Sequence, residues 1–167
     1  MAKVLLVVAP ERFRDEELFV TQVALQEAGH DTIVASTSPG VCPGSRGGSV
    51  TAVGLDDIDP VDIDAVVVVG GGGARLLFDD AALQELLRTA HDQDKVVAAI
   101  CLAPVVLARA GLLAGRRATV AGTMSGEIEQ HGATYTGPGV TVDGTVVTAN
   151  APKASRTFGE AIAELLR

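Results

Sequence analysis

One cysteine stands where a short apolar run gives way to a helix-forming segment. Cys101 directly follows the run Val96–Ile100, and Pro104 comes soon after it. The order predicts a buried strand, a sharp turn and a helix, which is the layout of a nucleophile elbow. Such a turn pushes the sulfur out of the sheet, and the next helix aims its N–H groups and positive dipole end at it. Both effects favour the thiolate, so we expect a lowered pKa for a nucleophilic Cys101. An inert cysteine buried at a strand end is the alternative, and position alone does not separate the two.

Four consecutive glycines, residues 70–73, follow a second apolar run at 64–69. Their spacing matches neither the dinucleotide-binding fingerprint nor the phosphate-binding P-loop, since no Gly-Lys-Ser/Thr follows. We therefore expect their backbone N–H groups to line an oxyanion site beside Cys101. A tight turn that needs positive φ angles would explain the same glycines, and the two interpretations are compatible.

Two acidic residues, Glu16 and Glu17, fall in the first turns of a helix predicted over residues 15–28. Acidic residues in that position commonly do no more than complement the helix dipole, and this is the simpler interpretation for either one alone.

The histidines and the second cysteine are predicted to lie away from the site. His30 and His131 stand beside glycines at helix ends, where solvated side chains are common, and His91 ends an amphipathic helix. A Cys-His pair is therefore not indicated, and no Cys/His/Asp cluster has the spacing of metal ligands. Cys42 lies in a Gly/Pro-rich segment and is expected to be a solvated bystander.

Alternating strands and helices must position these residues. Buried strands are predicted at residues 3–9, 31–36, 64–69 and 96–100, and helices at 15–28, 81–91, 103–110 and 154–166. A short strand at 118–121, a helix at 125–131 and a hairpin with an Asp-Gly turn at 140–148 complete the C-terminal half. Residues 38–48 are predicted to form a loop, 50–55 an edge strand or hairpin, and 56–64 a connector. This alternation predicts a doubly wound α/β fold, whose ligands bind beyond the carboxyl ends of the strands.

The length and net charge of the chain limit the number of domains and the binding partners that we expect. The chain has 167 residues, which fits a single domain over residues 1–167. Its net charge of −8 argues against binding to nucleic acids and to anionic membranes. We find neither a bilayer-spanning apolar run nor a signal peptide, so the cytoplasm is the expected location. With only two cysteines, a structural disulfide is not expected in that compartment.

Blocks along nearly the whole chain resemble the ThiJ/PfpI superfamily, in the same order. The matching blocks are the strand at 3–9, the segments 16–18 and 27–30, the run 64–71, the elbow 97–101 with Pro104, the stretch 110–119, and the end block from 143 through Phe158. The resemblance implies a flavodoxin-like three-layer sandwich of the class I glutamine-amidotransferase type, a homodimer, and no cofactor. It further implies that Cys101 is the nucleophile and that Glu17 is a protonated acid bonded to its sulfur. The oxyanion donors would be the backbone N–H groups of Gly71 and Leu102.

Two departures from the superfamily bear on function. Leu102 stands where the protease-like branch has a histidine, and the pair at 121–122 is Ala-Gly where another branch has His-Pro. Peptide hydrolysis needs a base and an acid, so peptidase activity is not expected. We favour a cysteine enzyme that adds to a small electrophile, like the glyoxalases, deglycases and isonitrile hydratases that the resemblance implies. The alternative is a redox-sensing or protective protein in which Cys101 is oxidised, and a purely structural role stays open.

Overall fold

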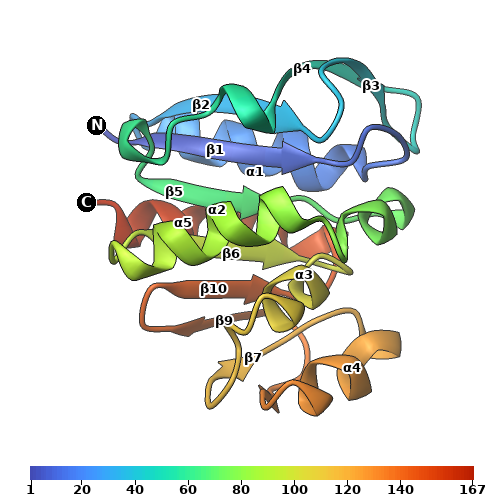
Figure 1. The fold of residues 1–167 in the computed structure, drawn as a ribbon, viewed down its shortest axis with the longest axis vertical. Coiled ribbons are helices and arrows are strands. Elements are labelled where there is room, and N and C mark those ends of the chain that lie inside the picture. The colour runs from blue at the N-terminus through green and yellow to red at the C-terminus, as the bar shows by residue number, and fades with distance from the viewer.

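The largest element of the fold is an eight-stranded sheet with the strand order β3-β4-β2-β1-β5-β6-β10-β9 (Figure 1). The computed structural model describes residues 1–167. The inner strands run parallel, and the edge strands β3 and β9 run antiparallel to their neighbours. The strands are β1 Lys3–Val8, β2 Asp31–Ser36, β3 Gly40–Pro43, β4 Ser49–Gly54, β5 Ala65–Val68, β6 Val96–Ile100, β9 Val140–Asp143 and β10 Val146–Ala149.

Helices cover both faces of this sheet. On one face lie α1 (Asp15–Glu27) and α5 (Ser155–Leu165), and on the other lie α2 (Ala81–Asp92) and α3 (Pro104–Arg109). Alternate residues of β1 enter opposite cores, because side chains along a strand point to opposite faces in turn. The predicted flavodoxin-like three-layer sandwich is thereby confirmed. None of these helices has the length and apolar character needed to cross a membrane.

The parallel strands fix where a site can form. In Figure 1 the arrows of β1, β5, β6 and β10 all point to the right, and both termini lie on the left. The segments that follow β1, β5 and β6 therefore meet at one edge of the sheet, as predicted. The C-terminal hairpin is also present, with Gly144 at a φ of 62° in its turn, while Asp143 still pairs with Val146 in the ladder.

The prediction of a loop over residues 38–48 is wrong in its first half. Residues Gly40–Pro43 form β3, which makes an antiparallel hairpin with β4. Strand alternation leaves Val41 70% exposed and buries Cys42 at 1% exposure, so the prediction of a solvated Cys42 is also wrong. Glycine and proline dominate the composition here, but Pro43 is tolerated because edge strands do not need every N–H group.

The strand predicted at 118–121 is replaced by a shorter one outside the main sheet. Strand β7 covers only Arg117–Ala118 and pairs in parallel with β8 (Thr134–Tyr135), with α4 (Ser125–Gln130) between them. The N–H group of Thr119, on the side of the chain away from β8, donates to the side chain of Thr148 at 2.9 Å.

His30 is buried, at 7% exposure, where a solvated position was predicted. Its backbone N–H closes α1 on Leu25 O at 3.1 Å, and its Nδ1 accepts from the backbone N–H of Ala2 at 3.0 Å. The ring thus joins the end of α1 to the start of β1. His131, by contrast, is exposed as predicted, with its ring beside Glu127 O.

Helices α1 and α5 approach closely at Gly159, which leads to a stability prediction. A Cβ at this position would lie 2.8 Å from the Ala24 Cβ and 3.0 Å from Thr21 O. We expect Gly159→Ala to lower the free energy of unfolding by about 1–2 kcal/mol, because the clash outweighs the better helix propensity of alanine. Gly126→Ala in α4, where the new Cβ meets nothing within 4 Å, is the control and should not destabilise. Urea unfolding measures both, and a Gly159→Ala protein as stable as the wild type would contradict this packing.

Candidate active site

Cys101 occupies the sharp turn between β6 and α3. Its φ angle of 64° is left-handed, a conformation that residues other than glycine rarely adopt. The surrounding backbone holds it there: Cys101 N–H donates to Ala149 O at 2.8 Å, and Cys101 O accepts from Ala121 N–H at 2.7 Å. The predicted nucleophile elbow is therefore present, with a half-buried cysteine at its apex.

The glycine loop after β5 lies directly against this elbow. A Cβ at Gly70 would lie 2.4 Å from Ile100 O and 2.9 Å from the Cβ of Cys101, so only glycine fits. The next residue, Gly71, has a φ of 99° and needs glycine for its backbone conformation. The backbone N–H groups of Gly71, in this loop, and of Leu102, at the start of α3, act on the sulfur and lower the pKa of the thiol.

Glu17 reaches the same point from α1 and is fully buried. Its Oε1 accepts from the backbone N–H of Gly70 at 2.9 Å. Its Oε2 has no hydrogen-bond partner, and the Cys101 thiol is the neighbouring side chain with the largest effect on this carboxyl. Only Glu16 behaves as a solvated acid at a helix start, since it is exposed and pairs with Arg14 at 3.0 Å.

Burial controls the protonation of both groups. It raises the pKa of the Glu17 carboxyl from 4.5 to about 8, against smaller opposing effects of Cys101, Gly70 and Arg14, so the carboxyl is largely neutral at neutral pH. Burial, followed by the negative charge of Glu17, raises the pKa of the Cys101 thiol to about 12. The prediction of a lowered thiol pKa is thus wrong, because the turn that exposes the residue still leaves its sulfur largely desolvated.

The two groups nevertheless favour one shared negative charge. Two adjacent anions are costly, so the pair releases a first proton far more readily than a second. With a pKa of about 8 against about 12, the first proton leaves Glu17, and the single charge rests on its carboxylate. The N–H groups of Gly71 and Leu102 lower the thiol pKa and so favour movement of that charge to sulfur. A thiolate beside a carboxylic acid is therefore reached by passing the thiol proton to an ionised Glu17.

The raised pKa of Glu17 predicts how stability depends on pH. A carboxyl whose pKa is about 8 when folded and 4.5 when unfolded favours folding fully below the lower value. That contribution is lost as the pH rises through the folded pKa. We expect the free energy of unfolding to fall by a few kcal/mol between about pH 5 and about pH 8, relative to Glu17→Gln. Chemical denaturation across this range measures the difference, and parallel pH profiles for the two proteins would contradict a buried neutral Glu17.

No imidazole shares this site. His30 contacts Ala2, His91 lies 3.0 Å from the guanidinium of Arg116, and His131 contacts its own helix. None of the three contributes to the environment of Cys101. No group of three or more histidine, cysteine or carboxylate side chains converges to offer a metal site.

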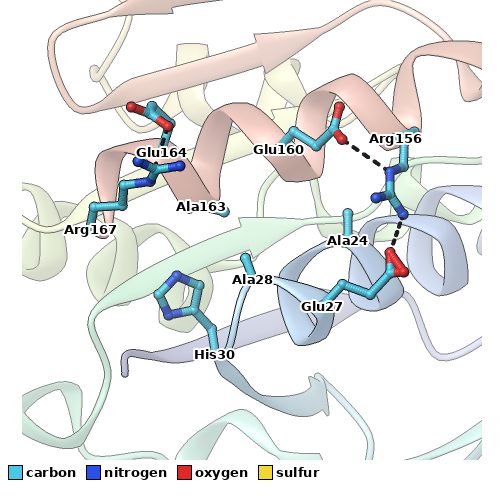
Figure 2. Close-up of a pocket in the computed structure, with 9 residues that line it drawn as sticks. All are labelled: Ala24, Glu27, Ala28, His30, Arg156, Glu160, Ala163, Glu164 and Arg167. Carbon is cyan, nitrogen blue, oxygen red and sulfur yellow. Dashed lines mark hydrogen bonds and ion pairs between the residues drawn. The ribbon is translucent and has the colours of Figure 1, made fainter.

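The cavities of the single chain lie elsewhere. Cys101 lines none of the four. One cavity of about 370 Å³ lies between α1 and α5 near His30, before β2, which is the opposite edge of the sheet (Figure 2). Its guanidinium groups are already paired with glutamates, so we assign it no role in chemistry at Cys101.

The structure thus brings together all four residues named from the sequence: Cys101, Glu17, Gly71 and Leu102. It adds backbone partners that sequence reasoning missed, namely the carbonyl of Ala149 and the N–H groups of Gly70 and Ala121. Backbone groups carry no residue-type signal, so nothing in the sequence could have identified them individually.

Comparison with known proteins agrees with this geometry. The model of the DJ-1/PfpI family matches residues 2–165. An uncharacterized protein of Methanocaldococcus jannaschii is 45% identical over 162 residues, which cover 95% of this chain and 79% of that protein. The deglycase PfpI of Pyrococcus furiosus is 32% identical, with 89% of this chain and 90% of that protein covered. The crystal structure of a ThiJ/PfpI domain protein from Brachyspira murdochii has a TM-score of 0.95 and 33% identity, covering 98% of this chain and 95% of that chain.

Proposed function

The chain belongs to the DJ-1/PfpI family, and from this premise we propose that it is a cofactor-independent cysteine enzyme acting on a small electrophilic metabolite. The substrate class is a carbonyl- or isonitrile-like compound, transformed by covalent addition followed by hydration or hydrolysis. The observation that carries the proposal is the convergence of Glu17 and the N–H groups of Gly71 and Leu102 on one sulfur. The name deglycase, borne by a relative at 32% identity, supports an activity of this general kind.

The first step can be written for an aldehyde. The Cys101 thiol passes its proton to the Glu17 carboxylate, the sulfur attacks the carbonyl carbon, a C–S bond forms, and the π electrons move to oxygen. The N–H groups of Gly71 and Leu102 would hold the developing oxyanion. Glu17 gives its proton to that oxygen, which leaves a neutral hemithioacetal and a carboxylate. The same carboxylate can later take a proton from water, so one acid serves both directions.

Peptide hydrolysis fits this site poorly. A peptidase must activate its nucleophile and also protonate an amine leaving group, and cysteine peptidases use an imidazole for this. Here the residue after the nucleophile is Leu102, which packs against the core on the α2–α3 face. Glu17 alone would have to serve every proton transfer, which suits addition to a small, already polarised carbon.

The test is turnover of a panel of reactive electrophiles by the wild-type protein. Methylglyoxal and an aliphatic isonitrile represent the two substrate types. We expect catalytic consumption of at least one compound without added cofactor. The proposal fails when no electrophile of either type is consumed faster than in buffer.

A second candidate function is redox sensing through Cys101. The surroundings that hold an oxyanion would also hold a sulfinate, with Glu17 as donor to one oxygen and backbone N–H groups to the other. A thiolate and two molecules of hydrogen peroxide would give the sulfinate and two molecules of water. Intact-mass measurement after mild peroxide should show two added oxygen atoms in the peptide with Cys101. Oxidation spread over methionines and Cys42 would count against sensing.

Two further expectations stay predictions. The resemblance stated above implies a homodimer, which light scattering on the purified protein would test. The cytoplasm is the expected compartment, and fractionation of the source cells would test it.

A further inference from the structure

Arg109 ends the short helix α3 and joins three segments that lie far apart in the sequence. Its Nη1 donates to both carboxylate oxygens of Asp79 at 2.9 Å. Its Nε and Nη2 reach Oε1 of Glu127 at 2.8 and 2.7 Å. Its guanidinium carbon lies 5.2 Å from the centroid of the Phe78 ring, which is 6% exposed. Phe78 and Asp79 come from the glycine-loop side, and Glu127 comes from α4.

Each of these segments carries a backbone group that touches Cys101. Phe78 caps the short helix Gly72–Leu77, which begins immediately after Gly71, a donor to the sulfur. Helix α3 begins just after Leu102, the other donor. Helix α4 follows Ala121, whose N–H donates to the carbonyl oxygen of Cys101.

The strength of the contacts differs. The Asp79 side chain is 79% exposed, so its ion pair is weakened by solvent, whereas the Glu127 side chain is 22% exposed and better shielded. The aromatic ring adds a cation–π contact on a buried surface. The hydrogen bonds to Asp79 and Glu127 raise the pKa of Arg109, which therefore keeps its charge.

We propose that Arg109 is a positioning residue, which fixes the glycine loop, the elbow helix and α4 relative to one another and so holds the N–H groups of Gly71 and Leu102 on the sulfur. The inference rests on the proposed function, because it assigns Arg109 to the reactivity of Cys101. Arg109 touches neither the sulfur nor Glu17, and it acts only through the segments that it joins.

Alkylation of Cys101 by iodoacetamide, followed against pH, tests this role without needing the substrate. The site of labelling is read from the mass of the Cys101 peptide. We expect Arg109→Ala to slow alkylation about tenfold and to move its midpoint to higher pH, because a donor displaced by a fraction of an ångström loses much of its effect. Arg109→Lys keeps the charge but not the paired geometry, and it should fall between wild type and Arg109→Ala.

Arg156 provides a matched control. It also bridges two carboxylates, Glu27 at 2.6 Å and Glu160 at 3.2 Å, but between α1 and α5, on the face of the sheet opposite α3 (Figure 2). Arg156→Ala should therefore leave the alkylation profile unchanged. If Cys101 reacts in the wild type and both Arg109 variants keep its alkylation profile, the role of Arg109 would be overturned, while the proposed function would stand. A Cys101 that does not react in the wild-type protein would instead overturn the proposed function, and this role with it.

Discussion

Cys101→Ser lowers turnover of the electrophilic substrate by at least about 10³-fold, a loss typical when the nucleophile is removed. A serine hydroxyl is far less acidic than a thiol and needs a strong base to attack. The structure places no imidazole near this position, and the neighbouring acid, Glu17, is neutral at neutral pH because its pKa is about 8. The measurement is kcat/KM with the best compound of the electrophile panel.

The second cysteine supplies the control for this variant. Cys42 is buried in β3, within the core on the α1–α5 face, and is not among the groups that shift the pKa of Cys101 or Glu17. Cys42→Ala should keep kcat near the wild-type value and change only stability. A Cys101→Ser protein that retains a tenth or more of wild-type activity would show that the sulfur is not the nucleophile.

Glu17→Gln is expected to lower kcat by about 10²- to 10⁴-fold, the usual worth of a positioned general acid. Glutamine keeps the size of the side chain and can still bond to Gly70, but it carries no proton to transfer. The same change also removes the negative charge that raises the pKa of the thiol. Alkylation of Cys101 above about pH 8 should therefore become faster while turnover becomes slower.

This opposite response of two rates separates a proton-transfer role from simple damage to the site. The neighbouring Glu16 is exposed and pairs with Arg14, so Glu16→Gln should change neither rate appreciably. If Glu17→Gln slowed alkylation and turnover to the same degree, the carboxyl would be shown to organise the site without transferring protons.

The elbow was predictable because its signals are local. A fully apolar run interrupted by one cysteine and followed by Pro104 leaves few alternatives to strand, turn and helix. The glycine loop and its place beside Cys101 were predictable for the same reason. The close contact of Gly70 with Ile100 O exists only once β5 and β6 pair in register.

Glu17 shows where local reasoning ends. In the sequence it is indistinguishable from Glu16, since both begin a helix, and only the family resemblance separated them. Helix geometry turns Glu17 toward the sheet and Glu16 toward solvent. The resulting burial sets the pKa values of Glu17 and Cys101, and so it reversed the expected direction for the thiol. Desolvation depends on how the chain packs, and the type of a residue does not predict it.

Cys42 and His30 were misplaced for a related reason. Composition around each residue suggested a loop or a solvated helix end, but tertiary pairing decided otherwise. The hairpin of β3 with β4 buries Cys42 and leaves its neighbour Val41 on the exposed side, and the ring of His30 accepts a hydrogen bond from the backbone N–H of Ala2. In both cases the burial depends on contact with a separate segment, which the residues next to Cys42 or His30 do not reveal.

The most direct test of the central claim is to observe carbon bonded to the Cys101 sulfur. A substrate aldehyde labelled with ¹³C at its carbonyl carbon would be mixed with the protein at low temperature and followed by NMR. The account predicts a resonance of a tetrahedral carbon bonded to sulfur, which is lost in Cys101→Ala. Turnover at full rate with no such resonance in the wild type, or with the same resonance in Cys101→Ala, would contradict it.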